Sequence, residues 1–339
     1  FMAQALVTGA TGFEESNLVE LLRNRGWEVN CLVRNESRAQ HLQSLGAKLF
    51  LGDLGNRESI DRAVAECDVV FHVAARVLAL HESEFHQDNV AGTRNVAETC
   101  AACSKPPTVV FVSSLAAGGP SRPGQPKQEG DEERPVSAYG ESKLAAERVL
   151  KTFADRMPLS IVRPPIVFGQ RDTSSLAIFI GVKNFRLHAV PGWRYFPVSV
   201  VHVSDLCEAL VRVAEQGERV PANSRSENNS STGIYHVAAE RTLHYGELGH
   251  LAGKALECGA IALHLPKFLM WLAGGWVEMV GHLKKQPGLL NLDKVREAVA
   301  SGWEGSDEKI RRELGYQQAA TLEQRFAETA KWYREAGWL

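Results

Sequence analysis

A tyrosine and a lysine four residues apart are the residues of this chain that most directly suggest chemistry. Tyr139 and Lys143 lie in a segment from Ala138 to Val149 whose pattern predicts a helix. Residues four apart share one face of a helix, so the Lys143 ammonium is expected beside the Tyr139 phenol. A nearby cation favours the phenolate and lowers the phenol's pKa from about 10. The pair is therefore a candidate acid/base.

Two serines precede this helix. Ser113 ends the predicted strand that begins at Val109, and Ser114 follows it, about one strand and one loop upstream of Tyr139. A hydroxyl at this place, together with the Tyr/Lys pair, suits a site that moves a hydride to or from an alcohol or ketone. The spacing alone leaves open which serine acts.

The elements that must position these residues are apolar strands alternating with helices. Strands are predicted at Ala3 to Thr8, Trp27 to Arg34, Lys48 to Leu51, Asp68 to Ala74, Val109 to Ser113 and Leu159 to Arg163, with helices between them. Strands that are apolar on both faces and separated by helices require a parallel sheet covered on both sides. We therefore expect an α/β fold of the Rossmann type, with a doubly wound parallel sheet.

The alternation weakens after Arg163, which predicts a second, smaller domain. We expect a dinucleotide-binding domain at 1–165, to which 198–216 returns as one more strand and helix. Residues 166–339 are expected to form a smaller, mainly helical substrate-binding domain. Within it, the polar segment Asn223 to Thr232 is expected to be mobile.

A glycine-rich turn follows the first strand and opens a helix. The run Thr8-Gly9-Ala10-Thr11-Gly12-Phe13 directs backbone amides and a helix amino end to where a pyrophosphate would lie. Gly9, Thr11, Gly12 and Phe13 are therefore candidate cofactor-binding residues.

Two carboxylates next to this turn conflict with the binding of a negatively charged pyrophosphate. Glu14 and Glu15 follow Phe13, and Glu15 stands where a third glycine is usual. Either both side chains point to solvent and act only on the helix dipole, or Glu15 disturbs the helix-to-strand packing and weakens or abolishes cofactor binding.

Residues at the ends of the next strands favour NADP over NAD as the cofactor. Arg34 stands where an acid would hold the 2′-hydroxyl of NAD, and a guanidinium suits a 2′-phosphate. Arg34 as a plain solvated cation is the alternative. Asp53 is placed to accept from the adenine amino group or, alternatively, to cap the following helix. Ala74 and Ala75 are small enough to let the cofactor pass.

Composition narrows the class of protein and of partner. With 44% hydrophobic residues in 339, a net charge of −2 and a pI near 6.6, the chain resembles an ordinary soluble protein and gives no argument for nucleic acid or an anionic membrane. Six scattered cysteines and no evident amino-terminal signal favour a reducing cytoplasm. Cys100-x-x-Cys103 has no second pair, so we interpret these as ordinary helix thiols and expect no metal site.

A strongly apolar stretch runs from Pro266 to Leu283. Gly274, Gly275 and Glu278 interrupt it, and it is too short to span a bilayer comfortably. Two interpretations stay open: a core or pocket-covering helix, or a helix that contacts an interface or a partner.

With these residues assembled, the chain resembles the extended short-chain dehydrogenase/reductase family, the NAD-dependent epimerase/dehydratase group. The matching motifs run along nearly the whole chain: Thr8 to Phe13, Gly52 to Leu54, Phe71 to Ala75, Asn89 to Thr93, Val112 to Ser114, Tyr139 to Lys143, Arg163 to Gly169 and Val201 to Asp205. Within this family, the chain looks most similar to the branch of the 3β-hydroxysteroid dehydrogenases, dihydroflavonol reductases and hopanoid-associated proteins.

The resemblance implies roles for single residues. Ser114 would hydrogen-bond the substrate oxygen, Tyr139 would exchange its proton, and Lys143 would hold the nicotinamide ribose and lower the Tyr139 pKa. Leu54 joins Asp53 among the cofactor-binding residues, and Pro164, Ile166 and Val167 would flank the nicotinamide amide. Related proteins are often dimers, so a homodimer is expected.

Three functions follow from these observations. The first is an oxidoreductase that moves a hydride between NADP(H) and a secondary alcohol or ketone of an apolar small molecule. The second is a nucleotide-sugar epimerase or dehydratase with tightly held NAD, for which Lys183, Arg186 and Arg194 would bind the diphosphate. The third is a non-catalytic sensor, motivated by Glu14 and Glu15.

Overall fold

The structure is a computed structural model that describes residues 3–192, 196–222 and 231–339. Arg194 and most of the segment from Asn223 to Thr232 therefore lie outside the described residues. No helix in the described ranges is long and apolar enough to cross a membrane.

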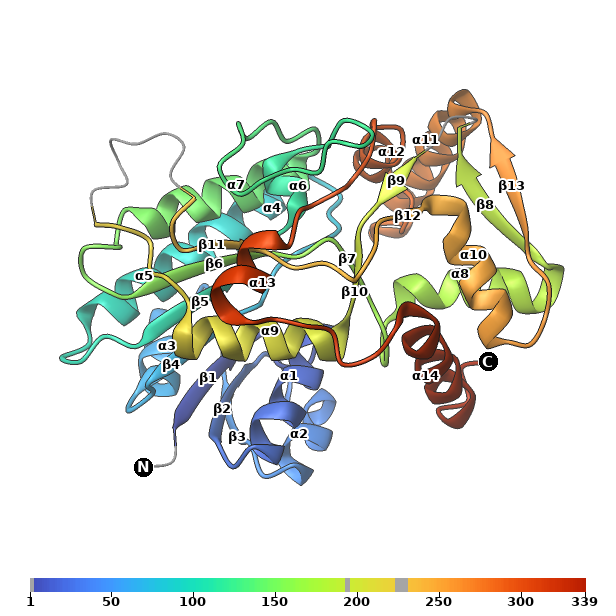
Figure 1. Ribbon diagram of the computed structural model, residues 1–339. Helices are drawn as coiled ribbons and strands as arrows, with labels where there is room; N and C mark the ends of the chain where they lie inside the picture. The colour runs from blue at the N-terminus through green and yellow to red at the C-terminus, as the bar shows by residue number, and fades with distance from the viewer. Residues whose placement is uncertain (1–2, 193–195, 223–230) are drawn as a thin grey trace.

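Within the described residues, seven parallel strands form the central sheet, in the order β11-β6-β5-β4-β1-β2-β3 (Figure 1). These strands are β1 (Gln4–Thr8), β2 (Glu28–Val33), β3 (Lys48–Leu51), β4 (Val69–His72), β5 (Thr108–Val112), β6 (Leu159–Arg163) and β11 (Ile234–His236). The predicted doubly wound parallel sheet is confirmed. β1 lies between β2 and β4, so the direction of winding changes there, and ligands of such sheets bind at the carboxyl ends beside that point.

Helices cover both faces of the sheet because alternate residues of each strand point to opposite sides. On β1, Ala5 and Val7 belong to one core and Leu6 to the other. The first core contains residues of α1 (Phe13–Asn24), α2 (Gln40–Ser44), α9 (Val203–Gln216) and α13 (Glu308–Leu314). The second contains residues of α3 (Arg57–Val64), α5 (Gly92–Ala102) and α7 (Ala138–Lys151).

Two features of the sheet were not predicted from the sequence. β11, in the part expected to be mainly helical, pairs with β6 and becomes an edge strand of the sheet. The strand expected after 198 is β10 (Val200–His202), which pairs with β7 (Ile166–Phe168) outside the central sheet. α9, which follows β10, does pack on the central sheet.

The other carboxyl-terminal elements form a smaller group with its own core, at the right of Figure 1. Its strands form pairs, β12 (Leu243–His244) with β9 (Pro197–Val198) and β13 (Ile261–Leu265) with β8 (Leu187–Pro191). The helices that contribute to this core are α8 (Thr173–Phe185), α10 (Tyr245–Ala255) and α14 (Leu322–Glu335). The two other helices of this part, α11 (Lys267–Lys284) and α12 (Leu292–Ala298), pack on each other.

Short helical turns complete the described elements. They are η1 (Glu36–Arg38), α4 (Glu82–Phe85), the π-helical η2 (His86–Ala91) and α6 (Leu115–Gly118). η2 runs directly into α5, and α6 begins directly after the two serines that follow β5.

Candidate active site

Tyr139 and Lys143 lie in the first turns of α7, which begins where the sequence predicted it. The Ser137 hydroxyl accepts from the Gly140 amide at 3.0 Å and so caps the helix. A Cβ atom at Gly140 would lie 2.5 Å from the Ala116 carbonyl oxygen. Glycine at this position therefore lets α7 approach α6 closely, which brings Tyr139 toward Ser114 at the start of α6.

The Lys143 ammonium is buried against the end of β5. Its Nζ donates to the Val112 carbonyl oxygen at 2.6 Å and lies 4.4 Å from the centre of the Phe111 ring. Burial lowers the pKa of Lys143 to about 8, although the charges of Glu14, Glu147 and Glu15 act in the opposite direction. The buried Lys143 ammonium therefore releases its proton more readily than an exposed lysine does.

The Ser114 hydroxyl lies close enough to the Tyr139 phenol to lower the phenol's pKa. Burial acts more strongly and, with the charges of Glu14 and Glu297, raises the pKa of Tyr139 above its usual value. The expectation that the pKa of Tyr139 lies below its usual value is therefore wrong for this arrangement. Lys143 is bonded to β5, and the desolvation of the phenol outweighs its favourable contacts. A phenol in this environment stays protonated, which suits donation of a proton to a ketone oxygen.

The structure distinguishes the two serines. Ser113 is buried, and its hydroxyl donates at 2.5 Å to Glu147, which in turn forms an ion pair with the buried Arg163. Ser114 is partly exposed, accepts from the Ala116 amide and contacts Tyr139. Ser113 is thus committed to a buried ion-pair network, whereas Ser114 faces the phenol.

Helix α12 contributes residues that the sequence did not reveal. The Asp293 carboxylate accepts from the amides of Ala138 at 2.7 Å and Tyr139 at 3.2 Å, at the positive end of α7. The Lys294 ammonium lies 4.5 Å from the centre of the Tyr139 ring. α12 therefore fixes the start of α7, from more than 150 positions away, where no local pattern could indicate it.

Asn89 holds the other side of the site. It sits in η2, and its amide nitrogen donates to the Ser142 hydroxyl at 2.9 Å and the Arg76 carbonyl oxygen at 3.0 Å, while its oxygen accepts from the Arg76 amide. These bonds tie the loop after β4 to α7. The motif containing Asn89 was noted in the sequence, but this role was not; π-helical turns are often found at functional sites.

The glycine-rich turn has the geometry expected of a phosphate-binding turn. The Gly12 amide donates to the Gly9 carbonyl oxygen at 2.8 Å, and Gly9 has a φ of 75°, which favours glycine. The N-cap of the twelve-residue α1 is Gly12, which has no side chain to cap the helix, and Thr11 is exposed. Phe13 packs against the core beneath the turn. The helix amino end and the backbone amides of the turn suit a dinucleotide's diphosphate.

Glu14 and Glu15 are only partly exposed, so the expectation that both point to solvent is wrong. The Glu15 carboxylate lies over the turn: a Cβ atom at Gly12 would be 2.1 Å from its Oε2, and one at Gly9 2.9 Å from its Oε1. Burial, then the charge of Glu14, raises the pKa of Glu15 to about 8. Burial raises the pKa of Glu14 to about 7, against the favourable charge of Lys143. The turn fits a diphosphate once the flexible Glu15 side chain moves aside.

The predicted adenosine-binding residues lie at the carboxyl ends of β2 and β3. Arg34 is exposed directly after β2. The Asp53 carboxylate accepts from the Gly55 amide at 2.7 Å. The cap of α3 is Asn56, whose side chain accepts from the Ser59 amide, so the alternative interpretation of Asp53 as that cap is wrong.

The remaining predicted cofactor contacts line the same sheet edge. Leu54 packs toward Gly92 of α5, and Ala74 donates its amide to the Thr8 hydroxyl at 3.2 Å beside the exposed Ala75. Past β6, the residues predicted beside the nicotinamide differ in exposure: Pro164 is buried, Val167 is partly buried, and Ile166 is 39% exposed.

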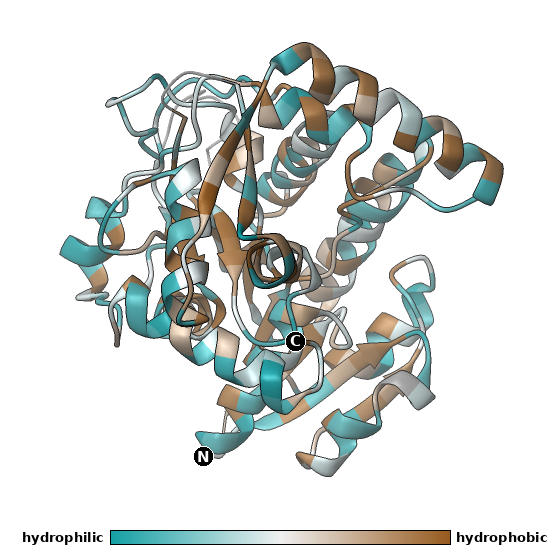
Figure 2. Cartoon of the chain, turned by 90° about the vertical axis from the view of Figure 1, so that its right-hand side faces the viewer, coloured by the Kyte–Doolittle hydropathy of each residue, from teal (hydrophilic) through white to brown (hydrophobic). Residues whose placement is uncertain are grey.

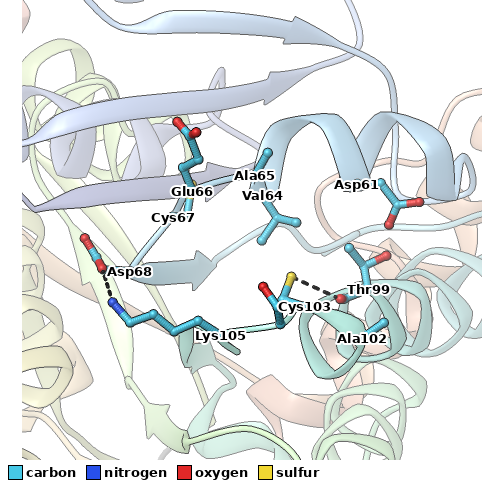
Figure 3. A pocket seen from close by; sticks show the side chains of 11 residues that line it. Asp61, Val64, Ala65, Glu66, Cys67, Asp68, Thr99, Ala102, Cys103 and Lys105 are labelled. Carbon is cyan, nitrogen blue, oxygen red and sulfur yellow. Dashed lines mark hydrogen bonds and ion pairs between the residues drawn. The ribbon is translucent and has the colours of Figure 1, made fainter.

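A hollow on the molecule involves the cysteine pair but lies away from this site. Residues of α3, of α5 and of the segment before β4 line it, and Cys103 and Lys105 face it (Figure 3). Lys105 pairs with Asp68, which precedes β4, so the hollow lies at the amino ends of the strands, opposite the glycine-rich turn. Cys100 is buried, and all six cysteines are free. The described residues include no group of three or more His, Cys, Asp or Glu able to hold a metal ion.

Comparisons with known proteins agree with this geometry. Residues 5–227 match the profile of the NAD dependent epimerase/dehydratase family. The ceramide reductase of Caulobacter vibrioides is 30% identical over 336 residues, which cover 98% of this chain and 95% of the relative. A 4-hydroxy-2-methyl-3-oxo-4-farnesyl-3,4-dihydroquinoline-1-oxide ketoreductase of Stigmatella aurantiaca is 35% identical over 222 residues, covering 63% of this chain and 65% of the relative.

A solved structure shares the fold over nearly its whole length. The UDP-glucose 4-epimerase of Thermus thermophilus, in complex with NAD, has a TM-score of 0.75 with 22% identity, covering 98% of this chain and 99% of that one. This likeness concerns the fold alone. Together with the matching family profile, the Ser114, Tyr139 and Lys143 arrangement leads to one conclusion: the chain belongs to the NAD dependent epimerase/dehydratase family and is an extended short-chain dehydrogenase/reductase.

Proposed function

We propose that this enzyme transfers a hydride between NADP(H) and a secondary alcohol or ketone of an apolar small molecule. The observation that carries the proposal is the contact of Ser114 with Tyr139, on the helix face that also holds the buried Lys143 cation. When bound, the nicotinamide supplies or accepts the hydride.

In this proposal, the chain's own residues orient the substrate and move its proton. The Ser114 hydroxyl donates to the substrate oxygen, and Tyr139 gives that oxygen its proton during reduction. The raised pKa of Tyr139 supports the reducing direction, because the phenol keeps its proton until the oxygen becomes more basic. Lys143 holds the nicotinamide ribose, and its positive charge stabilises the phenolate that remains.

The preference for NADP is part of the proposal and rests on Arg34. Its exposed guanidinium follows β2, where a 2′-phosphate would lie, and a guanidinium can pair with a phosphate through two parallel hydrogen bonds. Gly9, Gly12 and the start of α1 would hold the diphosphate, and Asp53 with Leu54 the adenine end.

An apolar substrate is supported by the relatives. One is named for a ceramide and another for a farnesylated quinoline, and both are reductases. For the epimerase alternative, Lys183 and Arg186 were expected to hold a nucleotide diphosphate. They instead line a small hollow with Cys258 and Arg334, which contains none of Ser114, Tyr139 or Lys143. This arrangement favours the reductase over the epimerase.

Turnover and cofactor binding test the proposal separately. NADPH oxidation is followed with apolar ketones (a 3-ketosteroid, a dihydroflavonol and a long-chain 3-ketoamide), and NADP and NAD are titrated by calorimetry. Tyr139→Phe is expected to lower kcat by at least about a hundredfold and to leave NADP affinity unchanged. The matched control is Tyr316→Phe, because the buried Tyr316 hydroxyl has no hydrogen-bond partner among the described residues.

Other outcomes would replace the proposal. Unchanged turnover in Tyr139→Phe would remove the proton-transfer role. NAD that copurifies tightly, with no net absorbance change on adding substrate, would favour the epimerase. Failure of both dinucleotides to bind would favour the sensor. A cytoplasmic location, supported by six free cysteines, and a homodimer also stay proposals, to be tested by cell fractionation and sedimentation velocity.

A further inference from the structure

Helix α11 exposes an unusual amount of apolar side chain. Leu272 is 66% exposed, Trp276 65% and Leu283 79%, and Phe268, Trp271 and Met279 are also more than a third exposed. We call these six residues the α11 surface. Figure 2 looks at the carboxyl-terminal side of the molecule, where the uppermost helix carries brown, hydrophobic residues along much of its length. The interpretation of this segment as a core helix is therefore wrong, whereas the pocket-covering helix named beside it stays a prediction.

The rest of α11 explains how it is held. Its buried residues are Met270, Gly274 and Gly281. A Cβ atom at Gly274 would lie 2.6 Å from Val295 of α12, so a small residue allows the two helices to pack closely. Small residues form the inner contact, and the large apolar ones stay outside. An exposed apolar surface of this kind commonly marks a site of interaction with a protein or a membrane.

The two-stranded ribbon before α11 continues this pattern. In the β8–β13 register, Leu187 pairs with Ile261 and Ala189 with Leu263, and all four residues are exposed. β13 leads through Pro266 directly into α11. One face of the ribbon is thus apolar and open, next to the helix in the chain.

Charge distinguishes a membrane from a protein partner here. Cations stand at both ends of α11, with Lys267 at the start and Lys284 and Lys285 at the end, all of them exposed. Between residues 258 and 289, Glu278 is the only acid in the sequence, and it accepts from the Leu292 amide at 3.0 Å. This stretch has three lysines and one glutamate, a net charge of +2, whereas the whole chain carries −2.

We propose that α11 docks the protein on the surface of an anionic lipid bilayer, lying in the plane of the headgroups. Tryptophans suit the headgroup region, leucine and phenylalanine suit the acyl boundary, and lysines at the ends attract anionic lipid. At 18 residues, α11 is about 27 Å long and lies on the bilayer without crossing it.

Docking would place the active site next to the bilayer. α11 packs on α12, and α12 holds the start of α7 through Asp293 and Lys294. A lipid-like substrate could then reach Tyr139 from the membrane. This consequence rests on the proposed function, whereas the docking itself does not.

Vesicle binding tests the docking without any substrate. The full chain is mixed with vesicles of equal parts phosphatidylglycerol and phosphatidylcholine, or of phosphatidylcholine alone, and bound protein is measured by cosedimentation. We expect binding to the anionic vesicles, with a blue shift of tryptophan emission that Trp271→Phe/Trp276→Phe removes. Lys284→Glu/Lys285→Glu is expected to weaken binding by about thirtyfold or more.

The matched control for charge is Lys105→Glu/Lys331→Glu, which changes the net charge equally on exposed residues outside α11. It is expected to weaken vesicle binding by less than about threefold. Leu272→Ser/Leu283→Ser is expected to abolish binding, and circular dichroism and NADP affinity serve as checks that this variant is folded.

Three results would overturn the proposal: no binding to anionic vesicles, equal binding to both vesicle types, or equal losses in the two lysine pairs. Self-association that Leu272→Ser/Leu283→Ser dissolves, with no vesicle binding, would assign the α11 surface to a second copy of the chain. The Tyr139→Phe variant separates this test from the test of the proposed function. It is expected to lose turnover and to bind vesicles as the wild type does.

Discussion

The substitution Glu15→Gln tests the effect of the carboxylate that lies over the glycine-rich turn, because glutamine has no charge there. Burial and the charge of Glu14 raise the pKa of Glu15 from 4.5 to about 8. The unfolded chain releases this proton near pH 4.5 and the folded chain near pH 8. Between these values the folded state binds more protons, so raising the pH destabilises it. A glutamine at position 15 has no such dependence.

The size of the effect follows from the two pKa values. Their difference, 8 − 4.5 = 3.5, corresponds to at most about 5 kcal/mol. Because the side chain is partly exposed and flexible, turning toward water reduces this cost, and we expect about 1–2 kcal/mol. In urea unfolding this corresponds to a midpoint change of about 0.5 M.

The assay compares urea unfolding of wild type and Glu15→Gln at pH 5, 6, 7 and 8. The variant is expected to gain relative stability steadily as the pH rises. Glu20→Gln is the control on the same helix, because Glu20 pairs with Arg171 near the surface. A wild-type-to-Glu15→Gln difference that stays constant from pH 5 to 8 would refute the reasoning. The same variant should bind NADP about tenfold more tightly at pH 8, since a charge facing the diphosphate is removed.

Other expected outcomes concern the residues around Tyr139. Glu147→Gln should destabilise the protein by about 3–5 kcal/mol in urea unfolding, because it leaves the buried Arg163 guanidinium without its full charge partner; an effect under 1 kcal/mol would contradict this. Arg163 holds the pKa of Glu147 below its usual value, so this stabilisation is present above about pH 4.5 and is lost as the pH falls through the lowered pKa. Ser114→Ala should lower kcat by at least about tenfold with little change in stability, whereas Ser113→Ala should cost about 1–2 kcal/mol, and a reversed pattern would exchange their roles. Lys294→Met should lower kcat a few-fold and leave NADP affinity unchanged; unchanged kcat would remove Lys294 from the positioning of Tyr139.

The sequence by itself determined the doubly wound sheet and the local parts of the site. Strands that are apolar on both faces admit few arrangements, and a helix fixes the spacing of Tyr139 and Lys143 whatever surrounds it. The glycine-rich turn at the end of β1 was identified for the same reason, because its geometry depends on neighbouring residues alone.

Only the tertiary structure decided what depends on distant partners. α12 contacts Tyr139 although the two are more than 150 residues apart in the sequence. β11 likewise pairs with β6, which lies far from it in the sequence. The pKa of Tyr139 was wrongly expected to fall because desolvation is a property of the whole surroundings. The exposure of Leu283 was likewise decided by folding. The sequence shows that this side chain is apolar, but only the packing of the folded chain decides whether other residues cover it.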